Sequence, residues 1–318
     1  MTFFSILFAL LIEQLKPLRA DNPVYAGARA LAEKLEGSFN AGQVQHGRIA
    51  WFLMIAAFII PVALLYWISL KIGPLAALIV NIAVVYVTLG FRHYSHFFTS
   101  IQLALNNGDE TTARSLLAEW TRRDTADMDV SEVARIAVEK ALVTTHRNVF
   151  GVFFWILTPL GPVGAIMYRV AEYLARAWSE PKTAEREEFG RFAVQAFYWI
   201  DWIPVRLTAA AFAVVGNFED AIYAWRNFAG RWQDEAVGII LSAGGGAMGI
   251  RLGASVENAA DVIPVDAGTV DSITLETETP VGEEASVRAL QSTVGLVWRA
   301  LLLWMLLVLL LSIAKWLG

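Results

Sequence analysis

Two charged side chains stand inside an apolar stretch of this chain. The stretch is "WIDWIPVRLT" (199–208), which holds Asp201 and Arg206 on either side of Pro204. An ionised group in an apolar segment costs ~2.5–3.5 kcal/mol on membrane-insertion scales, so it usually faces a partner or a wet cavity. On an unbroken helix the two charges would lie well apart in angle, but a proline kink would let them meet. Both a structural ion pair and a ligand site are consistent with this pattern.

A second charged cluster is formed by Arg169, Glu172 and Arg176. Their spacing of i, i+3 and i+7 places them on one stripe of a helix. Guanidinium groups recognise carboxylates and phosphates with two parallel hydrogen bonds, so a stripe of this kind suits an anion. A network of ion pairs that holds helices together is the alternative for this cluster as well.

Other motifs give no sign of a metal or a cofactor. His93 and His96 lie three residues apart and His146 lies farther along, but without a neighbouring carboxylate they favour packing or interfacial histidines over a metal site. The glycine cluster "SAGGGAMG" (242–249) lacks the GxGxxG spacing, so it predicts a flexible linker. The chain has no cysteine, and its net charge of −5 argues against nucleic acid as a partner. We therefore expect no metal and no cofactor.

The composition indicates an integral membrane protein. Of the 318 residues 56% are hydrophobic and 17% are charged, with 12 Trp and 18 Phe. The stretch 294–318, broken by Arg299 alone in its apolar run, is long enough to cross a hydrocarbon core of about 30 Å. The stretches 49–70 and 74–91 predict two further spans.

Two apolar segments are less regular. The N-terminal "MTFFSILFALLIEQLKP" (1–17) has no basic n-region and no small-residue cleavage site, so it predicts a helix lying against the membrane or packed in the fold. Residues 148–168 are interrupted by Thr158-Pro159 and Gly161-Pro162. This segment either spans with a kink or dips into the membrane and returns.

Lys and Arg are concentrated in 16–48 and 92–147, which by the positive-inside rule places both regions in the cytoplasm. The acidic, Thr-rich stretch 256–284 predicts a mobile loop. The fold class is therefore all-α, a polytopic (multi-pass) protein of a bacterial-type inner (cytoplasmic) membrane with a cytoplasmic helical region. In order, we expect an N-terminal amphipathic region (1–48), two transmembrane helices (49–92), a cytoplasmic helical region (93–147), membrane-embedded helices (148–216), an extramembrane glycine-rich and acidic loop region (217–285) and a C-terminal transmembrane helix (286–318).

A set of short motifs in a fixed order resembles a known superfamily. The segments are "LALNNGDETTARSLLAEWTRRDTADMDVSEVARIAVE" (103–139), "GPVGAIMYRV" (161–170), "FGRF…IPVRLTA" (189–209) and "AGGGAMGIRLGASV" (243–256). Over most of its length the chain is similar to the CobD/CbiB superfamily of membrane proteins. This resemblance implies an adenosylcobinamide-phosphate synthase of cobalamin biosynthesis, which joins cobyric acid to an aminopropanol, or to its phosphate, through an amide bond.

The chain departs from the synthase pattern at its carboxylates. Val143 and Thr144 stand at an acidic–amide pair, and Arg147 stands at an Asp. The remaining departures are Phe197 and Tyr198 for two Asp, Asp201 for Asn, Glu172 for Asn, Ala175 for Asp and Asn22 for His. Such carboxylates would hold a divalent metal or orient the amine, so their loss removes the expected machinery of the synthase.

The same departures resemble AmpE, a related inner-membrane protein tied to the regulation of β-lactamase induction. The similarity lies in Met1–Leu15, in "RHYSHFFTSI" (92–101) and in "DWIPVRL" (201–207). This branch implies a sensory or regulatory protein and not an enzyme. The alternatives are a synthase with rearranged catalytic groups, and a transporter for a corrinoid or a cell-wall fragment.

Together these patterns predict one polar pocket at the membrane face. Arg169 and Arg206 would meet an anionic small molecule or a lipid head group, and Asp201 and Glu172 would orient them. The candidate partners are thus membrane lipid, an anionic small-molecule ligand and a second copy of the chain in a homo-oligomer. The six candidate lining residues are Arg206, Asp201, Arg169, Glu172, Arg123 and Asp124.

Overall fold

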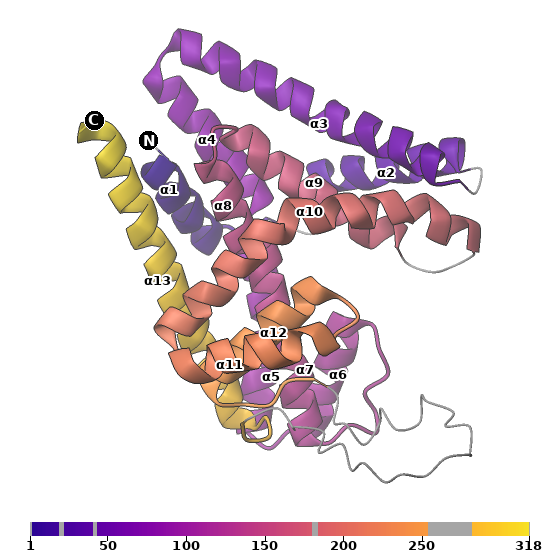
Figure 1. Cartoon of the computed structure of the whole chain (residues 1–318), viewed down its shortest axis with the longest axis vertical. Coiled ribbons are helices and arrows are strands. Elements are labelled where there is room, and N and C mark those ends of the chain that lie inside the picture. Colours follow the sequence, from indigo (N-terminus) through magenta and orange to yellow (C-terminus); the bar gives the residue numbers. More distant parts are fainter. Residues whose placement is uncertain (1, 19–21, 41–42, 180–183, 254–281, 318) are drawn as a thin grey trace.

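The computed structural model describes residues 2–18, 22–40, 43–179, 184–253 and 282–317, with the backbone alone for 91–94, 184–187 and 315–317. The described chain is helical throughout and has no strand (Figure 1). Its helices are α1 Thr2–Leu15, α2 Pro23–Phe39, α3 Val44–Ile72, α4 Pro74–Thr88, α5 Phe91–Asn106, α6 Glu110–Thr121, α7 Val130–Thr145, the π-helical turn η1 His146–Phe150, α8 Gly151–Leu157, α9 Pro162–Trp178, α10 Ala184–Val215, α11 Phe218–Phe228, the 3-10 turn η2 Ala229–Arg231, α12 Glu235–Met248 and α13 Val287–Leu317.

Three of these helices are long and apolar enough to cross a membrane. They are α3, the part of α10 from Glu188 to Val215, and the part of α13 from Val287 to Ala314. Each has 28 or 29 residues, against the roughly 20 that a bilayer requires. The prediction of an all-α membrane protein is confirmed.

The second expected span, 74–91, is shorter in the structure than the sequence suggested. Gly73, with φ of 149°, ends α3, and the extended backbone of Leu89 ends α4. The helix between them has fifteen residues, fewer than the roughly 20 needed to cross a bilayer. It packs instead against α1, α3 and α9, and α1 in turn also contacts α13 (Figure 1).

The interrupted apolar segment 148–168 forms a helical hairpin. The chain leaves α8 at the extended residue Thr158 and enters α9 after Gly161, whose φ of 55° favours glycine. Pro162 is well suited to the first position of α9, where its missing N–H has no partner to lose. Because α8 and α9 then pack against each other, the segment turns back on itself and does not continue as one kinked span.

The glycine cluster 242–249 is not the flexible linker that the sequence suggested. Within it, residues up to Met248 belong to the buried helix α12, which packs against α7, α10 and α11. Its glycines allow close approach: a Cβ on Gly244 would lie 2.8 Å from Leu142 Cδ1, and one on Gly246 would collide with the Asp220 carbonyl. Glycine thus serves packing here and not flexibility. Of the stretch 256–284, which was expected to form a mobile loop, residues 256–281 lie outside the described part of the chain.

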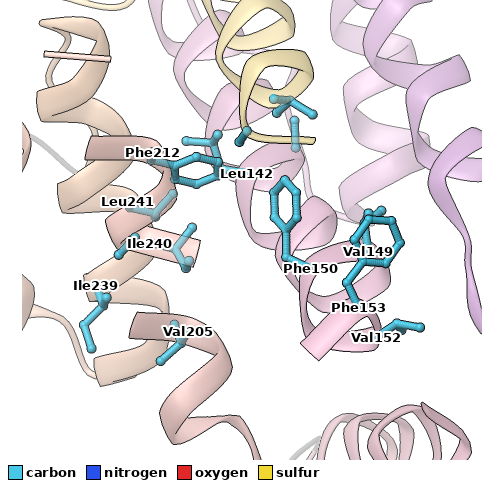
Figure 2. Packing of buried hydrophobic residues seen from close by; sticks show 14 of the residues in the cluster. Leu142, Val149, Phe150, Val152, Phe153, Val205, Phe212, Ile239, Ile240 and Leu241 are labelled. Atoms are coloured by element: carbon cyan, nitrogen blue, oxygen red, sulfur yellow. The ribbon is translucent and has the colours of Figure 1, made fainter. Parts of the chain in front are cut away.

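Apolar side chains from α7, η1, α10, α12 and α13 meet in the core (Figure 2). Phe150 lies among them, with its ring centroid 5.9 Å from that of Phe212 and 6.2 Å from that of Trp304. Leu142 and Leu241 are buried beside them. This packing holds η1 at the junction of the three helices α7, α10 and α13.

Two glycine-to-alanine substitutions separate packing from helix propensity. Gly246→Ala should destabilise the protein by about 1–3 kcal/mol, because the added methyl group must displace the backbone of α11. Gly37→Ala lies in α2 with no atom within 4 Å of the new Cβ, and should stabilise by about 0.5–1 kcal/mol. Thermal unfolding in detergent micelles measures both, and a Gly246→Ala protein as stable as the wild type would refute the close packing of α12.

Candidate functional site

The Asp201 carboxylate is buried and fully engaged by side chains of other elements. Its Oδ1 accepts a hydrogen bond of 3.0 Å from the hydroxyl of Tyr168 on α9. The Nε2 atom of His146 lies 2.9 Å from Oδ1 and 3.0 Å from Oδ2. Asp201 is 1% exposed, His146 2% and Tyr168 0%. The carboxylate therefore joins α10 to η1 and α9 in a site that excludes water.

The hydrogen bonds around His146 place one proton on its Nδ1 atom. The Thr208 hydroxyl donates to the Pro204 carbonyl at 3.0 Å, so its oxygen accepts from His146 Nδ1 at 2.9 Å. One proton then remains for the contact between Nε2 and Asp201, on either partner. In both arrangements the pair carries no net charge. This neutrality explains how a carboxylate resides in an apolar helix.

Local sequence features prepare the helices for this network. Pro204 has no N–H, so the carbonyl of Ile200 loses its usual helical partner. That carbonyl instead accepts a hydrogen bond of 3.3 Å from the indole N–H of Trp155. On the opposite side, Gly151 leaves room for the Tyr168 ring, which a Cβ at this position would strike.

Arg206 does not meet Asp201, and the kink at Pro204 does not bring the two together. Its guanidinium donates to Glu235 on α12 at 2.7 Å and to the Trp202 carbonyl at 2.9 Å. It also lies 4.1 Å from the centroid of the Trp202 ring. Tyr198 donates to the same Glu235 carboxylate at 2.7 Å. Arg206 thus fastens α10 to the start of α12, outside the cavity described next.

A cavity of about 410 Å³ lies beside the buried network. Two helical stripes contribute to its wall, each with the spacing i, i+3, i+4 and i+7, and α2, α3 and the end of α4 contribute further residues. The first stripe runs along α7 into η1, and the second lies on α9. The stripes consist of Lys140, Val143, Thr144 and Arg147, and of Arg169, Glu172, Tyr173 and Arg176.

Positive charge dominates the lining. Five cationic side chains face two carboxylates, an excess of three formal positive charges; they are Arg29, Lys140, Arg147, Arg169 and Arg176, against Glu13 and Glu172. Glu172 accepts from Arg169 and from Arg176, each at 3.3 Å. Burial acts to raise the pKa of Glu172, but the guanidiniums of Arg169, Arg176 and Arg147 outweigh it and lower the pKa. This carboxylate is therefore committed to its two arginines.

Lys140 has the opposite environment. Burial, followed by repulsion from the guanidiniums of Arg176, Arg147 and Arg123, lowers the pKa of its ammonium group. Glu172 acts weakly in the other direction. Within the described part of the chain its ammonium makes no ion pair with a carboxylate. Of these four cations, Lys140, Arg147 and Arg176 line the cavity.

The six residues predicted to share a pocket are distributed over five places. Arg169 and Glu172 line the cavity, and Arg123 acts on Lys140 from outside the lining. Asp124 accepts from the backbone N–H of Ala126 at 3.1 Å and shapes a turn. Asp201 lies in the buried network and Arg206 at Glu235, as described above. The single pocket of six residues is therefore not formed. In the described residues no group of three or more His, Cys, Asp or Glu could hold a metal ion.

Sequence reasoning missed Lys140, Arg29 and the aromatic residues of the lining. The signal was present in the spacing of Lys140, Val143, Thr144 and Arg147, which matches the stripe on α9. It was hidden because two of the four residues are not charged. Tyr25 and Trp120 come from separate helices, and only the fold brings them to the cavity.

Several motif residues are structural. Gly108, with φ of 75°, makes the turn before α6, and Asp109 caps that helix by accepting from Thr112 N at 3.0 Å. Arg114 donates to the Met128 carbonyl at 2.6 Å, and Thr125 donates to the Arg114 carbonyl at 2.8 Å. These bonds hold the connection from α6 to α7, and so fix where α7 presents its stripe.

The fold and the cavity define the class: an all-α membrane protein with a basic cavity bordered by a neutral buried network. A family model described as CobD/Cbib protein matches residues 6–262. The chain therefore belongs to the CobD/CbiB family.

Individual relatives agree with this assignment. The chain is similar to the cobalamin biosynthesis protein CobD of Stutzerimonas stutzeri (strain A1501), with 30% identity over 313 residues, 96% of this chain and 97% of the relative. It is also similar to the cobalamin biosynthesis protein CobD of Chromobacterium violaceum, with 32% identity over 199 residues and 63% of each chain. No solved structure matches the chain.

Substitution of Asp201 tests the buried network. Asp201→Asn should remain close to wild-type stability, because an amide can accept from Tyr168 and donate to His146 Nε2. Asp201→Leu should lose about 1–3 kcal/mol for each of the two groups left without a partner. Thermal unfolding and the monodisperse fraction in detergent measure the effect. Equal destabilisation by both substitutions would show that the site requires the negative charge itself.

Proposed function

We propose that this member of the CobD/CbiB family binds an anionic small molecule in the basic cavity and serves a sensory or regulatory role in the inner membrane. The observation that carries the proposal is the environment of Lys140. Its ammonium is repelled by three guanidiniums, and no carboxylate of the described residues pairs with it. Like charges held together raise the free energy of the empty site, and a bound anion lowers it.

The departures from the synthase pattern support this proposal. Val143, Thr144 and Arg147, which stand where the synthases carry an acidic–amide pair and an Asp, all contribute to the lining. A wall that would attract a divalent cation now contains a guanidinium. Glu172 stands where the pattern has Asn and is already held by two arginines. The substituted positions thus favour an anion bound directly by the protein.

The shape and lining indicate the class of ligand. A volume of about 410 Å³ suits a small molecule. The aromatic rings of Tyr25, Trp120 and Tyr173 lie in the same lining as the arginines, so a ligand with a phosphate or carboxylate group and a flat or apolar part would contact both kinds of wall. Basic residues near 16–48 and 92–147 support an opening toward the cytoplasm.

A synthase is the second candidate. The relatives named cobalamin biosynthesis protein CobD favour it, and so do the retained segments around Arg123-Asp124-Thr125 and Tyr168-Arg169. Against it are Val143, Thr144 and Arg147 in the lining, and Phe197 and Tyr198 at the two Asp positions. A regulatory protein of the AmpE type accommodates these departures without further assumptions.

Anion binding tests the proposal. Titration of inorganic pyrophosphate into the purified protein in detergent should give saturable binding by calorimetry. Arg147→Asp should weaken binding by at least about 100-fold, because it replaces an attractive charge by a repulsive one within a poorly hydrated site. Arg169→Gln should weaken binding by about tenfold or more.

The matched control is Arg288→Gln. Arg288 is exposed at the start of α13 and does not line the cavity, so its loss removes a positive charge without touching the site. The affinity of the Arg288→Gln protein for pyrophosphate should equal that of the wild type. Saturable binding that is equally weakened by Arg288→Gln would refute the cavity as the site, and absence of binding to the folded wild type would refute the proposed function.

A further inference from the structure

Lys140 is the amine of the cavity. The chain has six lysines, and of these Lys140 alone belongs to the described lining. It is held on α7, one turn before Val143 and Thr144 and two turns before Arg147. A primary amine can act as a nucleophile, which a guanidinium does not do, and anion binding alone makes no use of this reactivity.

The surroundings of Lys140 raise the fraction of its amine that is neutral and nucleophilic. Burial and the neighbouring Arg176, Arg147 and Arg123 lower its pKa, so more of the amine carries a free electron pair near neutral pH. Glu172, the nearby carboxylate that would restore the charge, is bound to Arg169 and Arg176. These are the conditions under which lysines react with carbonyl carbon.

The arginines of the lining can bind and stabilise a phosphate leaving group. Arg147 and Arg176 come from the two facing stripes and stand with Lys140 around the same space. A phosphate bound between guanidiniums is stabilised as a dianion, which also stabilises it as a leaving group. A ligand with a phosphate joined to an acyl carbon would therefore present that carbon to the amine.

We propose that Lys140 is a modification site at which an acyl phosphate, bound in the cavity, transfers its acyl group to Nζ. The inference rests on the proposed function, because the arginines must first bind the phosphate. The electron pair of the neutral amine attacks the acyl carbon, and a C–N bond forms. The C–O bond to phosphate breaks, inorganic phosphate leaves with the electron pair of that bond, and the amine proton passes to the phosphate or to water. The products are an amide at Lys140 and inorganic phosphate.

Acylation would change the site that catalysed it. The amide carries no charge, so the cavity loses one of its five cations and part of its attraction for anions. The modified protein would bind pyrophosphate more weakly, by about tenfold. The modification would thus report the supply of acyl phosphate and weaken the site that senses anions.

The test uses the full chain in detergent micelles with acetyl phosphate as the probe. Acetylation is measured by peptide mass spectrometry over time at Lys140 and, as internal controls, at Lys16 and Lys34. We expect Lys140 to react at least about tenfold faster than either control, because binding places the acyl carbon beside the amine. Inorganic phosphate should slow the acetylation of Lys140 and leave the acetylation rates of Lys16 and Lys34 unchanged. Arg176→Gln should reduce the advantage of Lys140.

A second reagent separates binding from intrinsic reactivity. The N-hydroxysuccinimide ester of acetic acid is neutral, so its reaction requires no anion site, and excess phosphate should not protect Lys140 from it. A rate at Lys140 equal to that at Lys16 and Lys34 with acetyl phosphate overturns the inference. If pyrophosphate still binds under those conditions, the proposed function stands alone. If pyrophosphate does not bind either, both the acylation of Lys140 and the proposed anion-binding function are refuted. A preference for Lys140 that phosphate does not suppress also overturns the inference, since the cavity would then play no part.

Discussion

The contact between Asp201 and His146 is the constraint on which the arrangement of the cavity depends. It fastens α10 to η1, and the hydroxyl of Tyr168 fastens α9 to the same carboxylate. The residues that follow His146 and Tyr168 in the sequence are Arg147 and Arg169, which both line the cavity. Arg169 also donates to the Arg147 carbonyl at 3.3 Å. A neutral network between the helices thus sets the positions of two arginines that line the cavity, of which Arg147 also donates to Asp234 at 3.4 Å.

Buried and accessible charges have different roles in this protein. At Asp201 each polar group has a partner and the net charge is zero, which is the condition under which polar groups tolerate an apolar surrounding. In the cavity positive charges exceed negative ones, and Lys140 has no carboxylate of its own among the described residues. The first arrangement stabilises a fold, whereas the second favours a ligand. Arg206 belongs to the first kind, because Glu235 and the Trp202 ring engage it.

Much of the fold could be predicted from the sequence, because apolar length and proline or glycine breaks are local signals. They indicated α3, α13 and the interruption before Pro162. The burial of α12 could not be predicted in this way, since Gly244 and Gly246 act through neighbours that are distant in the chain. For the site, the sequence identified Arg169 and Glu172 from their spacing. The sequence suggested Arg206 as the partner of Asp201. The partner in the structure is His146, which lies 55 residues away, and no sequence pattern connects it with Asp201.

We propose that this member of the CobD/CbiB family uses the cavity to bind an anion and not to form an amide between cobyric acid and aminopropanol. Complementation tests it most directly. The chain is expressed in a strain that lacks its cobinamide-phosphate synthase, insertion into the membrane is verified, and corrinoid-dependent growth is scored. We predict no growth, because Val143, Thr144 and Arg147 stand at positions where the synthase pattern has an acidic residue, an amide and an Asp. Growth at the rate of a strain with an intact synthase would contradict it.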